Sequence, residues 1–166
     1  MEGIVISAKL FSEINKQINF ELYSSYAYRA MAIYCKLKNF KGMAGWFEIQ
    51  AGEEHSHAMK MCEHLLDRGY KVTLLKIDEP QSDFKSLLEV FEKTLAHEKA
   101  VTAKIHELYK MALAEEDYPA QVMLQWFISE QVEEEAHASE IVDKIKLLGE
   151  KSGSIFMLDH ELGKRK

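Results

Sequence analysis

Ala51-Gly-Glu-Glu-His-Ser-His57 places a carboxylate and an imidazole, three residues apart, inside a long segment whose apolar residues have helical spacing. The row that passes through this stretch advances by steps of four and three: Met43, Phe47, Gln50, Glu54, His57, Met61 and Leu65. Such steps keep side chains on one face of a helix, and a mostly apolar face is the one that is buried. Glu54 and His57 therefore occupy positions at which a hydrophobic residue is expected.

Helical spacing extends over most of the chain. It predicts four long helices and a short terminal one, over about 7–38, 41–68, 83–113, 117–148 and 154–163. The ends carry helix signals: Ser7 is a good N-cap, Gly69 a good residue after a C-cap, and Pro119 fits a first turn. Either Ser82 or Asp83 is expected to cap the third helix.

The lengths of the connections predict the topology. Residues 39–42 are too few for anything but an antiparallel neighbour. Residues 70–82 lack helical spacing and, fully extended, would reach about 43–47 Å. The long helices would measure about 45 Å, so this connection can run the whole length of a bundle. We therefore expect an all-α protein, a single domain over 1–166, built as a four-helix bundle with one long crossover.

Composition limits the class of protein. The chain is 47% hydrophobic and 29% charged, which is typical of a globular domain, and its net charge of −6 argues against nucleic-acid binding. No segment approaches the roughly 18 apolar residues of a membrane span, and residues 1–7 lack the pattern of a signal peptide. Cys35 and Cys62 form no C-x-x-C motif, which excludes thiolate zinc and rubredoxin-type iron sites, and both are expected to be reduced core thiols. We expect a cytoplasmic protein.

Each long helix has one polar interruption near its middle. The interruptions are Glu21, the pair Glu54 and His57, Glu98, and the pair Gln131 and Glu134. Whichever way the helices point, these residues should meet in one layer of the core. Burying one ion costs several kcal/mol, whereas a domain has only about 5–15 kcal/mol of net stability. Four buried carboxylates without a basic partner on these rows therefore indicate bound divalent cations.

The residue types predict which cation. Glutamates from two helices, together with Glu-x-x-His from the others, are the pattern of a di-iron or di-manganese centre in a bundle. Glu54 and His57 form one such motif, and Glu134 with His137 offers a second. Gln131 competes with His137 for the same coordination space. Oxygen-rich ligation of this kind suits iron or manganese and not copper or structural zinc.

The motifs resemble those of bacterial and archaeal non-haem ferritins over essentially the whole chain. They are Asn19-Phe-Glu-Leu-Tyr-Ser-Ser25, Glu53-Glu-His-Ser-His57, His97-Glu98 and Leu124-Gln-Trp-Phe-Ile-Ser-Glu-Gln-Val-Glu-Glu-Glu135. The resemblance implies a ferritin-like fold with a short fifth helix. It also implies an iron-storage ferroxidase, which oxidises Fe(II) with O₂ or H₂O₂ and deposits ferric mineral inside a hollow homo-24-mer.

The resemblance also implies the ligands. One iron site would use Glu21, Glu54 and His57, and the other would use Glu54 as a bridge with Glu98, Glu134 and possibly Gln131. A third site would draw on Glu53, Glu130, Glu133 and Glu134. Tyr28 matches the family tyrosine beside the centre, although its spacing fits a core tyrosine equally well.

Three positions remain open. His137 matches the bacterioferritin motif and not the usual non-haem pattern, so either His137 or Gln131 completes the second site. His55 stands where bacterioferritins carry a haem-ligating methionine, so no haem is expected. The acidic run 115–117 either lines an entry channel or is a solvated helix N-terminus.

Other functions are compatible with a helical bundle. A rubrerythrin-type peroxidase would need a Cys₄ module, which two cysteines do not supply, and an oxygenase would need an apolar substrate pocket. A mini-ferritin would place iron between subunits, whereas these ligands converge within one chain. The basic tail 164–166 is expected to be a disordered end and not a DNA-binding arm.

Overall fold

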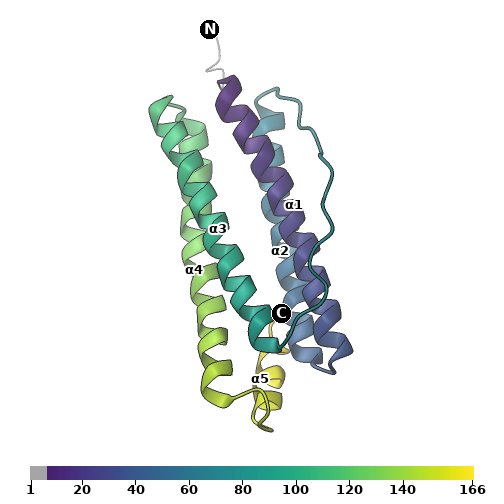
Figure 1. Ribbon diagram of the computed structural model, residues 1–166. Helices are drawn as coiled ribbons and strands as arrows, with labels where there is room; N and C mark the ends of the chain where they lie inside the picture. The colour runs from purple at the N-terminus through teal and green to yellow at the C-terminus, as the bar shows by residue number, and fades with distance from the viewer. Residues whose placement is uncertain (1–6) are drawn as a thin grey trace.

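The structure is a computed structural model that describes residues 7–166, and within that range the regular structure is entirely helical. The helices are α1 Ala8–Leu37, α2 Lys41–Asp67, α3 Leu87–Ala114, α4 Tyr118–Leu148 and α5 Ile155–Leu162 (Figure 1). No helix in the described part of the chain has an apolar stretch long enough to cross a membrane. The expectation that the N-terminal stretch 1–7 is not a signal peptide concerns residues 1–6, which lie outside the described residues.

Most helix ends fall where the sequence signals predict. The Oγ of Ser7 accepts a hydrogen bond of 3.1 Å from the Leu10 amide at the start of α1. Gly69 follows α2 with φ of +80°, a backbone conformation that side chains with a Cβ rarely adopt. Pro119 lies in the first turn of α4, whose N-cap Asp117 accepts a hydrogen bond of 3.0 Å from the Ala120 amide.

The predicted start of α3 is wrong by four residues. Ser86, not Ser82 or Asp83, is the N-cap, and its Oγ accepts a hydrogen bond of 3.0 Å from the Glu89 amide. A carboxylate oxygen of Glu89 in turn accepts one from the Lys85 amide. Ser86-Leu-Leu-Glu89 thus has the Ser-x-x-Glu spacing that satisfies two exposed amides together, an advantage that an isolated Ser82 or Asp83 lacks.

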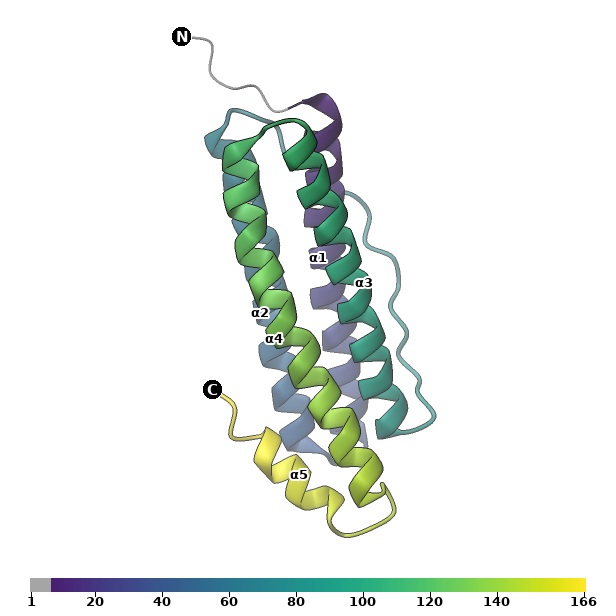
Figure 2. The ribbon, with the colours of Figure 1, turned by 90° about the vertical axis from the view of Figure 1, so that its left-hand side faces the viewer.

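The four long helices form a bundle in which α1 pairs closely with α2 and α3 with α4 (Figures 1 and 2). The predicted crossover runs along the outside of the bundle, so that α3 is parallel to α2. Two asparagines of α1 hold it in place. Asn15 exchanges two hydrogen bonds with the Thr73 backbone, at 2.9 and 3.1 Å, and the Oδ1 of Asn19 accepts one from the Leu75 amide at 2.7 Å.

Helix α5 packs against the start of α2 at the far end of the bundle (Figure 2). The Oδ1 of Asp159 accepts a hydrogen bond of 2.8 Å from the Met43 amide, which supplies the cap that Phe40 does not provide. Gly42 allows this close approach, because a Cβ there would lie 1.7 Å from the carbonyl oxygen of Asp159.

The apolar core consists of two clusters, one toward each end of the bundle. One contains Tyr28, Phe47, Phe91 and Ile155, and the other contains Leu10, Ile18, Ile105 and Leu124. The polar residues predicted to form one layer, which are Glu21, Glu54, His57, Glu98, Gln131 and Glu134, are all buried.

The predicted inner face of α3 needs a correction. The helical spacing of residues 83–113 predicts a buried row that includes Leu95, Glu98 and Tyr109. In the structure Leu95 and Tyr109 are only partly buried, whereas Thr94 and Leu108 are buried in their place. Because α3 carries apolar residues on a wide arc, its spacing alone does not fix which edge of that arc faces inward. Glu98 belongs to both versions of the row and is 1% exposed.

Candidate metal centre

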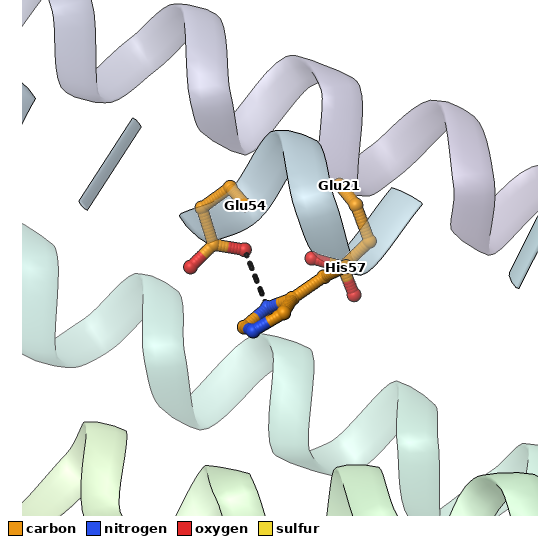
Figure 3. Close-up of side chains that lie close together, drawn as sticks. All are labelled: Glu21, Glu54 and His57. Carbon is orange, nitrogen blue, oxygen red and sulfur yellow. Dashed lines mark ion pairs between the residues drawn. The ribbon is translucent and has the colours of Figure 1, made fainter. Parts of the chain in front are cut away.

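Glu21 of α1 meets Glu54 and His57 of α2 in the interior of the bundle, and we call these three residues the α1–α2 half (Figure 3). Their ligand atoms all lie within 4.8 Å of one another. The Nδ1 of His57 is 3.5 Å from Oε2 of Glu54. The spacing of three residues puts Glu54 and His57 on one face of α2, which is why both reach the same point.

Two carboxylate oxygens in this half have no hydrogen-bond partner. Of the buried side-chain oxygens and nitrogens in the described residues, only three lack a partner, and Oε2 of Glu21 and Oε1 of Glu54 are two of them. Gln17 donates a hydrogen bond of 2.7 Å to the other oxygen of Glu21. A buried polar atom without a partner costs about 1–3 kcal/mol, so these two oxygens need either a proton or a cation.

Glu98 of α3 and Gln131 and Glu134 of α4 form the opposite side of the layer, which we call the α3–α4 half. Its carboxylates have protein donors. The hydroxyl of Tyr28 donates to Oε1 of Glu98, and Nε2 of Gln131 donates to Oε2 of the same residue at 3.2 Å. Nε2 of Gln50 donates to Oε2 of Glu134 at 2.5 Å.

Burial raises the pKa of all four glutamates of the layer. It is the largest cause for Glu21 and Glu54, whose pKa values lie well above the ordinary range, and nearby carboxylates add to it. Burial and the charge of Glu98 raise the pKa of Glu134 to about 7. For Glu98 the hydrogen bonds from Tyr28 and Gln131 oppose the rise caused by burial. Raised pKa values mean that the ionised form of these carboxyl groups is disfavoured in the protein alone. A bound cation would stabilise the ionised form.

The residues predicted for a third site lie on the outer side of the layer. Glu130 approaches His57, with its Oε1 4.0 Å from Nε2 of the imidazole, and Glu130, His57 and Glu134 form a second group whose ligand atoms lie within 4.8 Å. Glu53 is partly buried, and Glu133 is exposed. The structure thus brings Glu130 to the layer and leaves Glu133 at the surface.

The structure places Gln131 and His137 very differently. Gln131 is 2% exposed and contacts Glu98, whereas His137 is exposed beside Glu140 and Lys144. The chain therefore brings Gln131, and not His137, into contact with the buried carboxylates. The residues of the acidic run 115–117 differ in burial. Glu115 and Glu116 are exposed, whereas Asp117 is buried and forms an ion pair of 2.8 Å with Arg68.

Sequence reasoning missed two residues that contact the layer directly and a third that reaches it through one of them. Gln17 and Gln50 each lie four residues before a buried glutamate on the same helix, a spacing that the sequence displays. The third is Arg165. The prediction that the tail 164–166 is a disordered end is wrong for this residue, because its guanidinium pairs with Glu53 at 2.5 Å and donates to Oε1 of Gln50 at 2.8 Å.

Comparisons with known proteins agree with the fold. The ferritin-like domain model matches residues 11–148. A probable bacterial non-heme ferritin-like protein of Haemophilus influenzae is 38% identical over 159 residues, which are 96% of each chain. The bacterial non-heme ferritin of Escherichia coli O157:H7 is 35% identical over 158 residues, or 95% of this chain and 96% of that one.

A solved structure of an open-pore ferritin from Archaeoglobus fulgidus is 43% identical and superposes with a TM-score of 0.97, covering 99% of this chain and 100% of that chain. The chain belongs to the ferritin-like family. The predicted resemblance and the predicted fold, a four-helix bundle with one crossover and a short fifth helix, are confirmed.

Proposed function

We propose that this protein is the subunit of an iron-storing ferritin and acts as a ferroxidase. It oxidises Fe(II) to Fe(III) at a paired site within one bundle and passes the product to a ferric mineral inside a hollow homo-24-mer. The names of its relatives, bacterial non-heme ferritins and an archaeal ferritin, support storage. No haem enters the proposal, since those bacterial relatives are named non-heme.

The observation that carries the proposal is the pair of buried, partnerless oxygens of Glu21 and Glu54 beside the imidazole of His57. Two carboxylates and an imidazole are a ligand set that suits Fe(II). Glu54 has ligand atoms on the α1–α2 side and is influenced by the charges of Glu98 and Glu134 on the other. It is therefore the residue that we expect to bridge two ions.

The chemistry needs two ions because of electron balance. Each Fe(II) loses one electron, and O₂ takes up both electrons with two protons to give H₂O₂; alternatively, H₂O₂ takes up two electrons and two protons to give water. The carboxylates stabilise the charge that rises as Fe(III) forms. The hydroxyl of Tyr28, hydrogen-bonded to Glu98, keeps its proton because burial and nearby carboxylates raise its pKa well above the ordinary value.

The third group, Glu53, Glu130, Glu133 and Glu134, is proposed to receive iron on the way out of the paired site. Within this group Glu134 is buried, Glu53 and Glu130 are partly buried, and Glu133 is exposed. Weaker, more hydrated carboxylate ligation suits an ion that must move on, whereas an enzyme that only used the metal as a catalyst would retain it.

An anaerobic Fe(II) titration followed by addition of O₂ tests the proposal, on protein whose size is first measured by chromatography. We expect a shell-sized assembly that binds about two to three Fe(II) per chain before oxidation and many more afterwards. A dimer that binds the same ions but takes up no more would instead favour a di-iron enzyme of another type. Binding of no Fe(II) would contradict the proposal.

A further inference from the structure

Arg165 lies on α2 at the outer edge of the polar layer. Beyond α5 the chain turns back along α2 (Figure 2). The guanidinium then makes three contacts with that helix: an ion pair of 2.5 Å to Oε2 of Glu53, a hydrogen bond of 2.8 Å to Oε1 of Gln50, and a stacking distance of 5.0 Å to the Trp46 ring. A planar guanidinium is well suited to contact an oxygen pair and an aromatic face together.

These contacts continue into the buried layer. The amide of Gln50 accepts from Arg165 through its oxygen and donates from its nitrogen to Glu134 at 2.5 Å. A single glutamine thus connects a partly exposed cation with a buried carboxylate. Among the described residues, Arg165 itself thus contacts no member of the paired site, and the only carboxylate that it contacts directly is Glu53.

We propose that Arg165 closes the third iron site, and that its guanidinium must leave Glu53 before a metal ion binds there. This inference rests on the proposed function, in which Glu53 is one of the third-site ligands. The guanidinium and Fe(II) are both cations that require the carboxylate oxygens of Glu53. They therefore compete, and the tail lowers the affinity of the third site while leaving the paired site unaffected.

The position of Arg165 depends on how α5 is docked. Only two residues separate Arg165 from the end of α5, and α5 is fixed to α2 through Asp159 and the close approach at Gly42. Substitution of Gly42 by alanine would push α5 away and carry Arg165 with it. This gives a second way to open the site without altering any residue that contacts Glu53.

The test is anaerobic calorimetric titration of the full assembly with Fe(II), comparing wild type with Arg165→Ala. Removal of a partly exposed ion pair should raise the affinity of the weakest Fe(II) step about two- to fivefold and leave the tighter steps unchanged. Arg165→Lys, which keeps the charge but loses the paired geometry, should fall between wild type and Arg165→Ala. Lys166→Ala is the matched control, because Lys166 has no ion pair with any described residue, and it should equal wild type.

A double variant separates competition from a general effect on structure. In a Glu53→Gln background, Arg165→Ala should change nothing, because no carboxylate remains to be released. Unchanged or weaker Fe(II) binding by Arg165→Ala alone, in a protein whose wild type binds Fe(II), overturns the role of Arg165 and leaves the proposed function intact. A wild type that binds no Fe(II) overturns both.

Discussion

The two halves of the polar layer differ in how their carboxylates are satisfied. In the α3–α4 half the chain itself supplies donors, with Tyr28 and Gln131 on Glu98 and Gln50 on Glu134. In the α1–α2 half one oxygen of Glu21 and one of Glu54 have no partner. Since both halves are buried to a similar degree, the difference lies in the donors and not in access to water.

This difference indicates in which half a bound cation contributes the most favourable free energy. An ion that enters the α1–α2 half satisfies two orphaned oxygens and breaks no hydrogen bond to them. An ion that enters the α3–α4 half must displace or rearrange donors, and hydrogen bonds to charged groups contribute about 1.5–3 kcal/mol each. We therefore expect the α1–α2 half to bind Fe(II) first and about ten- to a hundredfold more tightly.

The largest effect is expected from Glu54→Ala, which removes the residue shared by both halves. Substitutions that only support a metal ligand already cost about 10–100-fold, so loss of this ligand should slow Fe(II) oxidation more than about 100-fold. Stopped-flow absorbance of Fe(III) after mixing with O₂ measures the rate. The shell should still assemble, because the two apolar clusters are untouched.

Glu48→Ala is the matched control for that variant, since Glu48 is an exposed glutamate of the same helix that pairs only with Lys36 among the described residues. It should oxidise Fe(II) as fast as wild type. Rapid oxidation by Glu54→Ala would contradict the claim that Glu54 is a ligand shared by the two halves.

The next effect is the pH dependence of stability without metal. Burial raises the pKa of Glu134 from 4.5 to about 7. Between these values the native state holds a proton that the unfolded state has lost, so the free energy of unfolding decreases as pH rises. For Glu134 the decrease amounts to about 3 kcal/mol by pH 7.

Glu134→Gln has no such proton to lose. Calorimetric unfolding of chelator-treated protein between pH 5 and 8 should therefore show a midpoint that falls less steeply with pH in the variant than in wild type. Added Fe(II), which binds the ionised carboxylate, should reverse the trend in wild type. Parallel pH profiles for the two proteins would show that the pKa of Glu134 is not raised in the folded protein.

The smallest effect distinguishes the two candidates for completing the α3–α4 half. Gln131→Ala removes the buried amide whose oxygen is a candidate ligand of the second ion. Loss of that ligand should outweigh the release of its hydrogen bond to Glu98 and weaken the second Fe(II) step about tenfold. His137→Ala changes an exposed side chain and should alter neither step by more than about twofold. Anaerobic titration of both variants measures this, and the opposite ranking would assign the second site to His137.

The fold was largely predictable because its signals are local. Ser7, Gly69 and Pro119 act within one helical turn of themselves, and the length of the crossover follows from chain geometry alone. The start of α3 was missed because three possible caps lie within five residues, and the deciding partner, Glu89, lies beyond them. The inner face of α3 was misplaced because its apolar arc is wide.

The site was predictable to the extent that it lies on helical rows. Glu21, Glu54, Glu98 and Glu134 interrupt those rows at matching heights, which is visible without coordinates. The contact of Arg165 with Glu53 joins residues 112 positions apart and depends on the docking of α5 at Gly42. No local pattern carries that information. The tail 164–166 was therefore predicted from its basic composition alone, which is typical of a disordered end.

The most direct test of the account is anomalous diffraction at the iron edge from crystals soaked anaerobically with increasing Fe(II). The account predicts that the first peak appears among Glu21, Glu54 and His57, and that a second peak near Glu98 and Glu134 follows at higher Fe(II). A first peak in the α3–α4 half, or no peak inside the bundle, would contradict the claim that the partnerless oxygens of Glu21 and Glu54 are there to bind iron.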